Sequence, residues 1–283
     1  MLMRLGDIEI WRVLEWVGPF ISPFKFYPDL DEAGLDEIKR HAPRQLDAET
    51  GKIVLPVQGF LIRDGVNTVL VDSCVGNHKT VDWFPDWHQK TDSRFMASLT
   101  AAGAAPEDVT HVLCTHLHVD HTGWNTRLLD GRWVPSFPNA RYLVSQADLD
   151  LFGGENTQTY QDNVAPIVAA GLAEIVGPDH GIGDHIRLIP TPGHTPGHVS
   201  VKVSGGGRDL ILTGDALHSP VQCWHPEWRF ASDEDAGLAV ESRKKLLGNA
   251  AETQASVIGS HFPLPSVGTV RAEGDHFAWD DGN

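Results

Sequence analysis

The alternation of apolar and polar positions predicts strands in two groups along the chain, each followed by helices. The first group of predicted strands comprises residues 7–16, 52–62, 68–72, 111–114 and 141–144. The second group comprises residues 185–190, 199–203, 209–213 and 255–258. Helices are predicted at residues 30–41, 93–103, 146–152, 164–173 and 233–249. This order indicates an α/β fold in which two packed sheets carry helices outside them.

The predicted elements follow one another without an internal boundary. No low-complexity tract or linker-like segment interrupts the sequence, so we expect a single domain spanning residues 1–283. The strongest predicted helix is residues 233–249. Its apolar face is predicted to contain Leu238, Val240, Leu246 and Leu247. Its basic residues near the end, which suit the helix dipole, are Arg243, Lys244 and Lys245.

Two aromatic segments lie between the predicted elements. Residues 20–27 carry four aromatic side chains among prolines, and we interpret them as exposed residues suited to contacts between two copies of the chain. Residues 83–87 contain Trp83, Phe84 and Trp87. These three side chains either pack against the body of the protein or, together with Trp224, wall a pocket for an apolar ligand.

Charge and cysteine content narrow the classes of partner. Lys and Arg number 22 against 38 Asp and Glu, a net charge of −16, which disfavours nucleic acid and membrane surfaces and suits a neutral small molecule. The three widely separated cysteines, Cys74, Cys114 and Cys223, are typical of free thiols in a reducing compartment. The N-terminal residues lack the apolar run of a signal peptide, so we expect a cytoplasmic protein.

The densest chemical signal is a run of metal-binding residue types. His116, His118, Asp120 and His121 follow the apolar strand 111–114, and imidazole nitrogen and carboxylate oxygen are the ligands that divalent transition metals prefer. At a turn that follows a strand, His116 and His118 can point to one place while Asp120 and His121 point to a neighbouring one. One short loop is therefore expected to serve two metal ions.

Three more candidate ligands share this position after a strand. His194, Asp215 and His261 each follow a short apolar run, and ligands at one edge of a sheet converge on one site. Gly193, Gly214 and Gly259 lie just before them and allow the backbone to turn sharply and approach a metal ion.

Taken together, these five segments resemble the metal-binding motifs of the metallo-β-lactamase superfamily. The resemblance covers most of the chain and includes Asp72, which resembles the superfamily aspartate that supports the metal ligands. It implies a four-layer αββα sandwich with two divalent metal ions per chain. By this resemblance, His116, His118 and His194 hold one ion, Asp120, His121 and His261 hold the other, and Asp215 bridges them. Zinc is the expected metal, with iron, manganese or cobalt as alternatives.

The resemblance also implies a reaction class. A hydroxide shared by two metal ions attacks the substrate, and Asp120 orients it or passes a proton to the leaving group. The segments around Asp72, Asp215 and His261 are similar to the branch that contains N-acyl-homoserine lactone lactonases, 4-pyridoxolactonase and methyl parathion hydrolase. We therefore expect a lactone or related ester as substrate. Hydrolysis of organophosphate triesters or aryl esters is the alternative, and a metal-dependent binding or sensing protein without turnover is the alternative of another class.

The remaining histidines have plainer interpretations. His198 is expected to support the ligands or pack, and His111 to be structural. His218 lies three residues after Asp215, where the lactonases of this branch carry a tyrosine that contacts the substrate. His218 is therefore a catalytic candidate that either donates a hydrogen bond to the substrate oxygen or lines the pocket. Relatives in this branch are commonly dimers, so a homodimer is expected by analogy.

Overall fold

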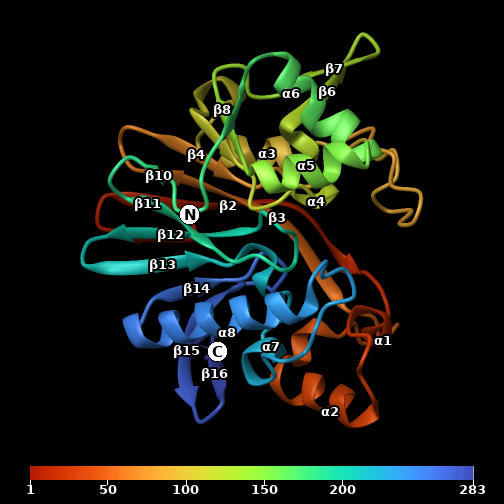
Figure 1. The fold of residues 1–283 in the computed structure, drawn as a ribbon, viewed down its shortest axis with the longest axis vertical. Coiled ribbons are helices and arrows are strands. Elements are labelled where there is room, and N and C mark those ends of the chain that lie inside the picture. Colours follow the sequence, from red (N-terminus) through yellow and green to blue (C-terminus); the bar gives the residue numbers. More distant parts are fainter. Residues whose placement is uncertain (283) are drawn as a thin grey trace. The chain divides into compact units, whose positions relative to one another are not determined.

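The computed structural model describes residues 1–282 and divides into two compact units (Figure 1). One unit comprises Met1–Trp16 and Val57–His185, and the other comprises Val17–Pro56 and the chain from Ile186 onward. Neither unit is a continuous stretch of sequence. That the whole chain acts as the single domain expected from the sequence stays a prediction.

The strands of residues 1–282 form two seven-stranded sheets and a separate hairpin. The first sheet has the order β1 (Met3–Leu5), β2 (Ile8–Pro19), β3 (Val54–Arg63), β4 (Thr68–Val71), β5 (His111–Leu113), β8 (Arg141–Val144) and β9 (Ala173–Ile175). The second has the order β10 (Gly181–Ile182), β11 (Ile186–Pro190), β12 (Val199–Gly205), β13 (Arg208–Leu212), β14 (Ser256–Ile258), β15 (Val267–Glu273) and β16 (His276–Asp280). The hairpin is β6 (Thr126–Leu129) with β7 (Arg132–Pro135).

The α-helices lie close to the predicted positions where the sequence signal is long. They are α1 (Pro23–Phe26), α2 (Glu32–His41), α3 (Arg94–Ala101), α4 (Val119–Thr122), α5 (Gln146–Gly154), α6 (Ala165–Ala169), α7 (Val221–Trp224) and α8 (Ala236–Thr253). The predicted helix 164–173 is shorter than expected and continues a π-helical turn at Tyr160–Val164. A 3-10 turn, η5 (Gly214–Ala216), follows β13.

Parallel strand pairs place chemically active residues side by side in each unit. In the first unit β4 pairs with β5 in parallel, and the N–H of Asp72 donates to the carbonyl of Leu113 at 2.9 Å. In the second unit β13 pairs with β14 in parallel, and the N–H of Thr213 donates to the carbonyl of Ile258 at 2.9 Å. The segments that follow the two strands of each parallel pair therefore lie at the same edge of the sheet. This is the arrangement predicted for ligands that converge on one site.

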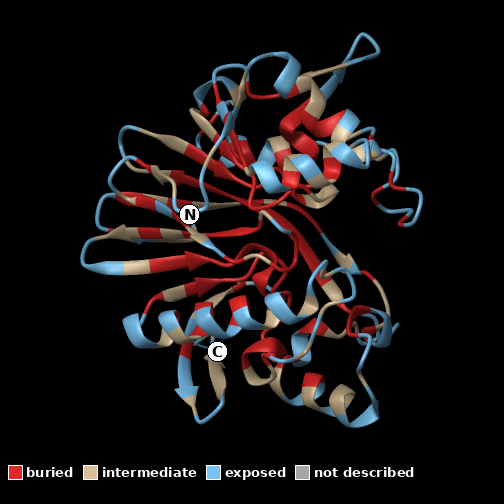
Figure 2. Cartoon of the chain, in the orientation of Figure 1, coloured by how far each residue is buried: buried red, intermediate tan, exposed pale blue. Residues whose placement is uncertain are grey.

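Helix α8 begins later than predicted and buries a different face. Asp235 is its N-cap and accepts a hydrogen bond from the Leu238 N–H at 2.9 Å. Its buried residues are Ala239, Ser242, Arg243, Leu246, Leu247 and Ala250. Figure 2 shows buried and exposed stretches alternating along this helix. The prediction was right for Leu246 and Leu247 but wrong for Leu238, which is exposed, and Val240 is only half-buried. The buried face of α8 includes the charged residue Arg243, so the spacing of apolar residues alone does not identify this face.

The aromatic segment at residues 20–27 is largely interior, so its interpretation as an exposed contact surface is wrong. Phe20, Phe26 and Tyr27 are buried, and Phe26 packs edge-on against Tyr27 with ring centroids 4.9 Å apart. Only Phe24 among its four aromatics is exposed, with 41% of its surface accessible. Apolar packing within the second unit accounts for these side chains, and the expected homodimer stays a prediction.

Two of the three aromatic side chains at residues 83–87 pack against the body of the protein, which was one of the two alternatives for this segment. Phe84 and Trp87 are buried against Trp16, with centroid distances of 5.5 Å and 5.8 Å. Trp83 is 63% exposed. Trp224, the fourth candidate wall, stacks on His41 at 4.1 Å. Phe84 and Trp87 therefore pack within the first unit, and a pocket walled by Trp83 or Trp224 stays a prediction.

A buried lysine in the first unit has an unusual environment. The Lys79 ammonium donates to the Thr126 hydroxyl at 2.7 Å and lies 3.4 Å from the centre of the Trp133 ring. Burial lowers the pKa of Lys79 from 10.5 to about 7, although the charge of Asp162 opposes this shift. Above neutral pH the unfolded chain therefore binds a proton at this position that the folded chain does not.

This environment predicts a pH dependence of folding stability. Because the unfolded state binds more protons between pH 7 and 10.5, the Lys79 contribution should raise the free energy of unfolding with pH in that window, with a slope of up to about 1.4 kcal/mol per pH unit. Lys79→Met should remove that slope, and Lys244→Met, at an exposed position of α8, should keep it. Urea titrations at several pH values measure the difference, and equal slopes in all three proteins would contradict the assignment.

Candidate metal centre

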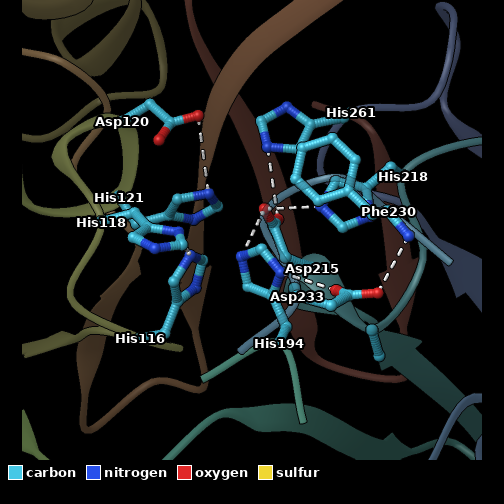
Figure 3. Close-up of polar contacts among 12 residues, drawn as sticks. His116, His118, Asp120, His121, His194, Asp215, His218, Phe230, Asp233 and His261 are labelled. Atoms are coloured by element: carbon cyan, nitrogen blue, oxygen red, sulfur yellow. Dashed lines mark hydrogen bonds and ion pairs between the residues drawn. The ribbon is translucent and has the colours of Figure 1, made fainter. Parts of the chain in front are cut away.

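The first group of predicted ligands lies on the loop after β5 and on helix α4. His116 Nε2 lies 3.0 Å from His118 Nδ1, and Asp120 Oδ2 lies 3.7 Å from His121 Nε2 (Figure 3). His116 and His121 are each 1% exposed. The first unit thus brings its four predicted ligands into two close pairs.

Asp72 holds this loop in place, as the resemblance implied. Its φ is +58°, and its carboxylate accepts the Thr115 N–H at 2.8 Å and the Thr115 hydroxyl at 2.9 Å. The same carboxylate lies 2.8 Å from His121 Nδ1. Because the Thr115 hydroxyl donates its proton to Asp72, the Thr115 hydroxyl oxygen accepts a hydrogen bond from His116 Nδ1 at 3.1 Å. The supporting role predicted for Asp72 is borne out by these contacts.

The second group of candidate residues surrounds Asp215 on the turn η5. Asp215 carboxylate oxygens lie 3.4 Å from His194 Nε2, 3.2 Å from His261 Nε2 and 3.1 Å from His218 Nε2 (Figure 3). All four side chains are buried. Ligand atoms of His194, Asp215 and His218 lie within 4.8 Å of one another.

The far nitrogens of the two predicted ligand histidines in this group, His194 and His261, each lie beside an oxygen acceptor. His194 Nδ1 lies 3.1 Å from an Asp233 carboxylate oxygen, and His261 Nδ1 lies 2.8 Å from the Pro56 carbonyl oxygen. His198 is not a ligand: its Nε2 accepts the Asp215 N–H at 2.8 Å. This contact confirms the supporting role expected for His198.

These contacts allow a test of whether the residues fit metal ions. A carboxylate or a carbonyl can only accept, so the hydrogen-bond network assigns the proton of neutral His121, His194 and His261 to Nδ1 and the lone pair to Nε2. Those Nε2 atoms lie 3.7, 3.4 and 3.2 Å from carboxylate oxygens. A lone pair and a carboxylate repel each other unless a proton or a metal ion lies between them. Histidines with one nitrogen so held are the usual ligands of divalent metals, and the donors fit.

The three glycines that precede the predicted ligands are required for different structural reasons. Gly193 has φ +129°, and a Cβ there would lie 2.1 Å from the backbone nitrogen of Ala239 in α8. Gly214 has φ +54°, which allows the turn that presents Asp215. Gly259 differs, since a Cβ there would meet the Phe262 ring at 2.1 Å. The positive φ of Gly193 and Gly214 fits the predicted sharp turns, with close packing as a second reason at Gly193, whereas close packing alone explains Gly259.

Sequence reasoning missed two residues of this site. Asp233 was placed inside a helix, yet its carboxylate accepts the Phe230 N–H at 2.9 Å as well as binding His194. The Phe230 ring stacks on His218 with centroids 3.8 Å apart. The only sequence signal was the acid-rich run Asp233 to Asp235, which is equally typical of a helix start.

Cysteine chemistry is not available at this site. Cys114 precedes the histidine loop, and burial raises the pKa of its thiol to about 12. Burial likewise raises the pKa of Cys74 and of Cys223. All three are free thiols, as predicted, and they stay protonated near neutral pH, so none is a thiolate nucleophile.

Comparison with known proteins assigns the family. Residues 53–261 match the model of the metallo-β-lactamase superfamily, and the chain belongs to that superfamily. The hydrolase AbOPH of the β-lactamase superfamily is 27% identical, with a TM-score of 0.81 over 98% of this chain and 95% of its own. The predicted α/β sandwich of the metallo-β-lactamase type is thereby confirmed. The chain is an enzyme of the metal-dependent hydrolase class.

Curated relatives match the predicted branch. The N-acyl homoserine lactonase of Bacillus cereus is 28% identical over 68% of this chain and 75% of its own length. The N-acyl homoserine lactonase AttM of Azorhizobium caulinodans is 28% identical over 82% of this chain and 91% of its own. AidC, a dizinc quorum-quenching lactonase with a bound product, shares the fold with a TM-score of 0.80 at 22% identity over 99% of this chain and 96% of its own. No helix within residues 1–282 is long and apolar enough to cross a membrane.

Proposed function

We propose that this protein is a dinuclear metal-dependent hydrolase that opens lactones or related carboxylic esters. The observation that carries the proposal is the orientation of His121, His194 and His261. Each of these histidines directs the Nε2 lone pair toward the carboxylate of Asp120 or Asp215. The lactonase relatives support the substrate class. The proposed ligands are His116, His118 and His194 for one metal ion, Asp120, His121 and His261 for the other, and Asp215 for both. Zinc is the proposed metal, with iron, manganese and cobalt as alternatives.

Bound divalent metal ions would supply Lewis acidity, which makes water a nucleophile at neutral pH and stabilises charge on the substrate oxygen. Side chains of the protein would orient the water, transfer the proton and donate a hydrogen bond to the substrate. The Asp120 carboxylate would orient the attacking water and carry a proton to the leaving alkoxide oxygen. His218 Nε2 lies 3.1 Å from an Asp215 carboxylate oxygen, and its Nδ1 has no hydrogen-bond partner among the described residues, so the proposed donor to the substrate is a His218 ring N–H beside Asp215. The proposed nucleophile is water, because the cysteines are protonated.

The partners and compartment follow from composition. We propose a neutral small-molecule substrate, because a net charge of −16 gives no general attraction to anions. Three buried free thiols support a reducing, cytoplasmic compartment.

The metal content and the turnover should be measured on one preparation. We expect about two metal ions per chain, and faster hydrolysis of a lactone than of an aryl ester or a phosphotriester. Elemental analysis and a three-substrate panel test this. A stoichiometry of one or less after reconstitution would contradict the dinuclear centre, and a preference for the phosphotriester would replace the lactone with the alternative substrate class.

Replacement of His218 should separate its two interpretations. If its N–H donates to the oxygen that gains charge, His218→Ala should lower kcat by about 10²–10³-fold with a smaller change in KM. Steady-state kinetics on the best lactone measure this, with the surface variant His276→Ala as the matched control. A changed KM at constant kcat would make His218 a lining residue.

A further inference from the structure

Arg243 is a buried charge in the middle of helix α8 that makes contacts beyond the helix. Its side chain is fully buried. Its Nε donates to the Ala216 carbonyl at 2.8 Å, and its Nη1 donates to the Pro226 carbonyl at 2.9 Å and to the Trp228 carbonyl at 2.6 Å. Its Nη2 lies 3.8 Å from an Asp233 carboxylate oxygen. One guanidinium thus contacts two separate segments of the second unit.

Both of these segments carry residues of the candidate metal centre. Ala216 directly follows Asp215 in the turn η5. The segment 226–233 carries Asp233, which holds His194, and Phe230, which stacks on His218. Figure 3 shows Asp233 between His194 and the backbone of Phe230. Arg243 therefore connects the turn of the central carboxylate with the segment that orients two neighbouring imidazoles.

A second side chain makes a parallel connection. The Gln222 side chain accepts the backbone N–H of His218 at 2.7 Å and donates to the Trp228 carbonyl at 3.0 Å. The Trp228 carbonyl is thus shared by Gln222 and Arg243. A displacement of residues 226–233 would therefore shift His218 in two ways. It would move the His218 backbone through Gln222 and the His218 ring through Phe230.

Packing alone does not require arginine at this position. The other buried residues of α8 are apolar or small, and an aliphatic side chain would avoid the cost of burying a charge. Burial lowers the pKa of Arg243, and the charge of Asp233 opposes this shift. What only arginine provides is a planar fork that donates to several carbonyls in fixed directions.

We propose that Arg243 is a positioning residue for the metal centre, which sets the orientation of His194 through Asp233 and of His218 through Phe230. This inference rests on the proposed function, because it requires that His194 and Asp215 bind metal.

Metal binding tests the proposal without any substrate. Arg243→Met and Arg243→Lys should be loaded with Co²⁺, and the affinity measured by competition with a chromophoric chelator. We expect a loss of about 10–100-fold in affinity for Arg243→Met, as for other residues that orient metal ligands, and a partial recovery for Arg243→Lys. The visible absorption of bound Co²⁺ should change, because the orientation of His194 changes. Lys244→Met, next to it on the exposed side of α8, should match the wild type in both measurements.

The route through Asp233 is tested by a double variant. Asp233→Asn alone should lower the Co²⁺ affinity, and Asp233→Asn combined with Arg243→Met should lose less than the sum of the two effects. Arg243 variants that fold and keep the wild-type affinity and spectrum would overturn the proposal. If neither Arg243 variant folds, Asp233→Asn decides, and wild-type Co²⁺ binding in it would overturn the route to His194. A wild-type protein that binds Co²⁺ yet hydrolyses no substrate of the panel would overturn the proposed function alone, whereas a wild type without Co²⁺ binding would overturn both.

Discussion

Asp215→Asn is expected to lower turnover by at least about 10²-fold while the protein still folds. The reason is the central position of this carboxylate, which lies within 3.4 Å of ring nitrogens of His194, His218 and His261. Asparagine has the same shape but lacks the charge that offsets metal ions. Asp120→Asn should behave similarly, because that carboxylate is both a proposed ligand and the proposed proton carrier.

The experiment needs rate, metal content and melting temperature from the same preparation. Asp209→Asn is the matched control, because Asp209 is a partly exposed carboxylate on the strand β13 that leads to Asp215, and it pairs with Lys202 at 2.7 Å. The control should keep wild-type rate and metal content. Near-wild-type turnover of Asp215→Asn with its full complement of metal would mean that Asp215 is not the bridging ligand.

Sequence reasoning found the strands that present the candidate ligands, because buried strands leave a local signal. Strands β5, β11 and β14 each differ from the predicted bounds by one residue, and β13 is shifted by one residue. Each is a short apolar run followed by a polar turn, so periodicity and turn chemistry agree. The strands that were missed are β1, β9, β10, β15, β16 and the hairpin β6–β7, which carry mixed, partly exposed residues.

The supporting contacts could not be predicted, because they join residues far apart in the sequence. The interaction of His194 with Asp233 spans 39 residues, and that of His261 with Pro56 spans 205. No local pattern distinguishes Asp233 from an acid at a helix start. The buried face of α8 was misassigned for the same reason, since only tertiary contacts show that Arg243 faces inward.

A second charged residue with interior partners, Glu15 on β2, carries the largest expected effect on stability. Its side chain is fully buried and accepts from the Val75 N–H at 2.7 Å, the Trp124 indole N–H at 2.6 Å and the Lys90 ammonium at 2.6 Å. Val75 lies just after Asp72, so the same carboxylate fixes the segment that supports the histidine loop. Glu15→Ala would leave the Val75 and Trp124 N–H groups buried without this acceptor and would take the closest carboxylate from Lys90, at a cost of about 3–5 kcal/mol.

Urea titration should show this loss as a lower midpoint with an unchanged slope. Glu9→Ala is the matched control on the same strand: Glu9 pairs with Arg63 at 2.7 Å but is 24% exposed, so water can replace the carboxylate and the loss should be much smaller. Glu15→Gln combined with Lys90→Met should recover part of the stability, because it removes the buried ammonium that has lost its closest carboxylate in Glu15→Ala. Equal losses for Glu9→Ala and Glu15→Ala would show that the buried carboxylate stabilises the first unit no more than an exposed one.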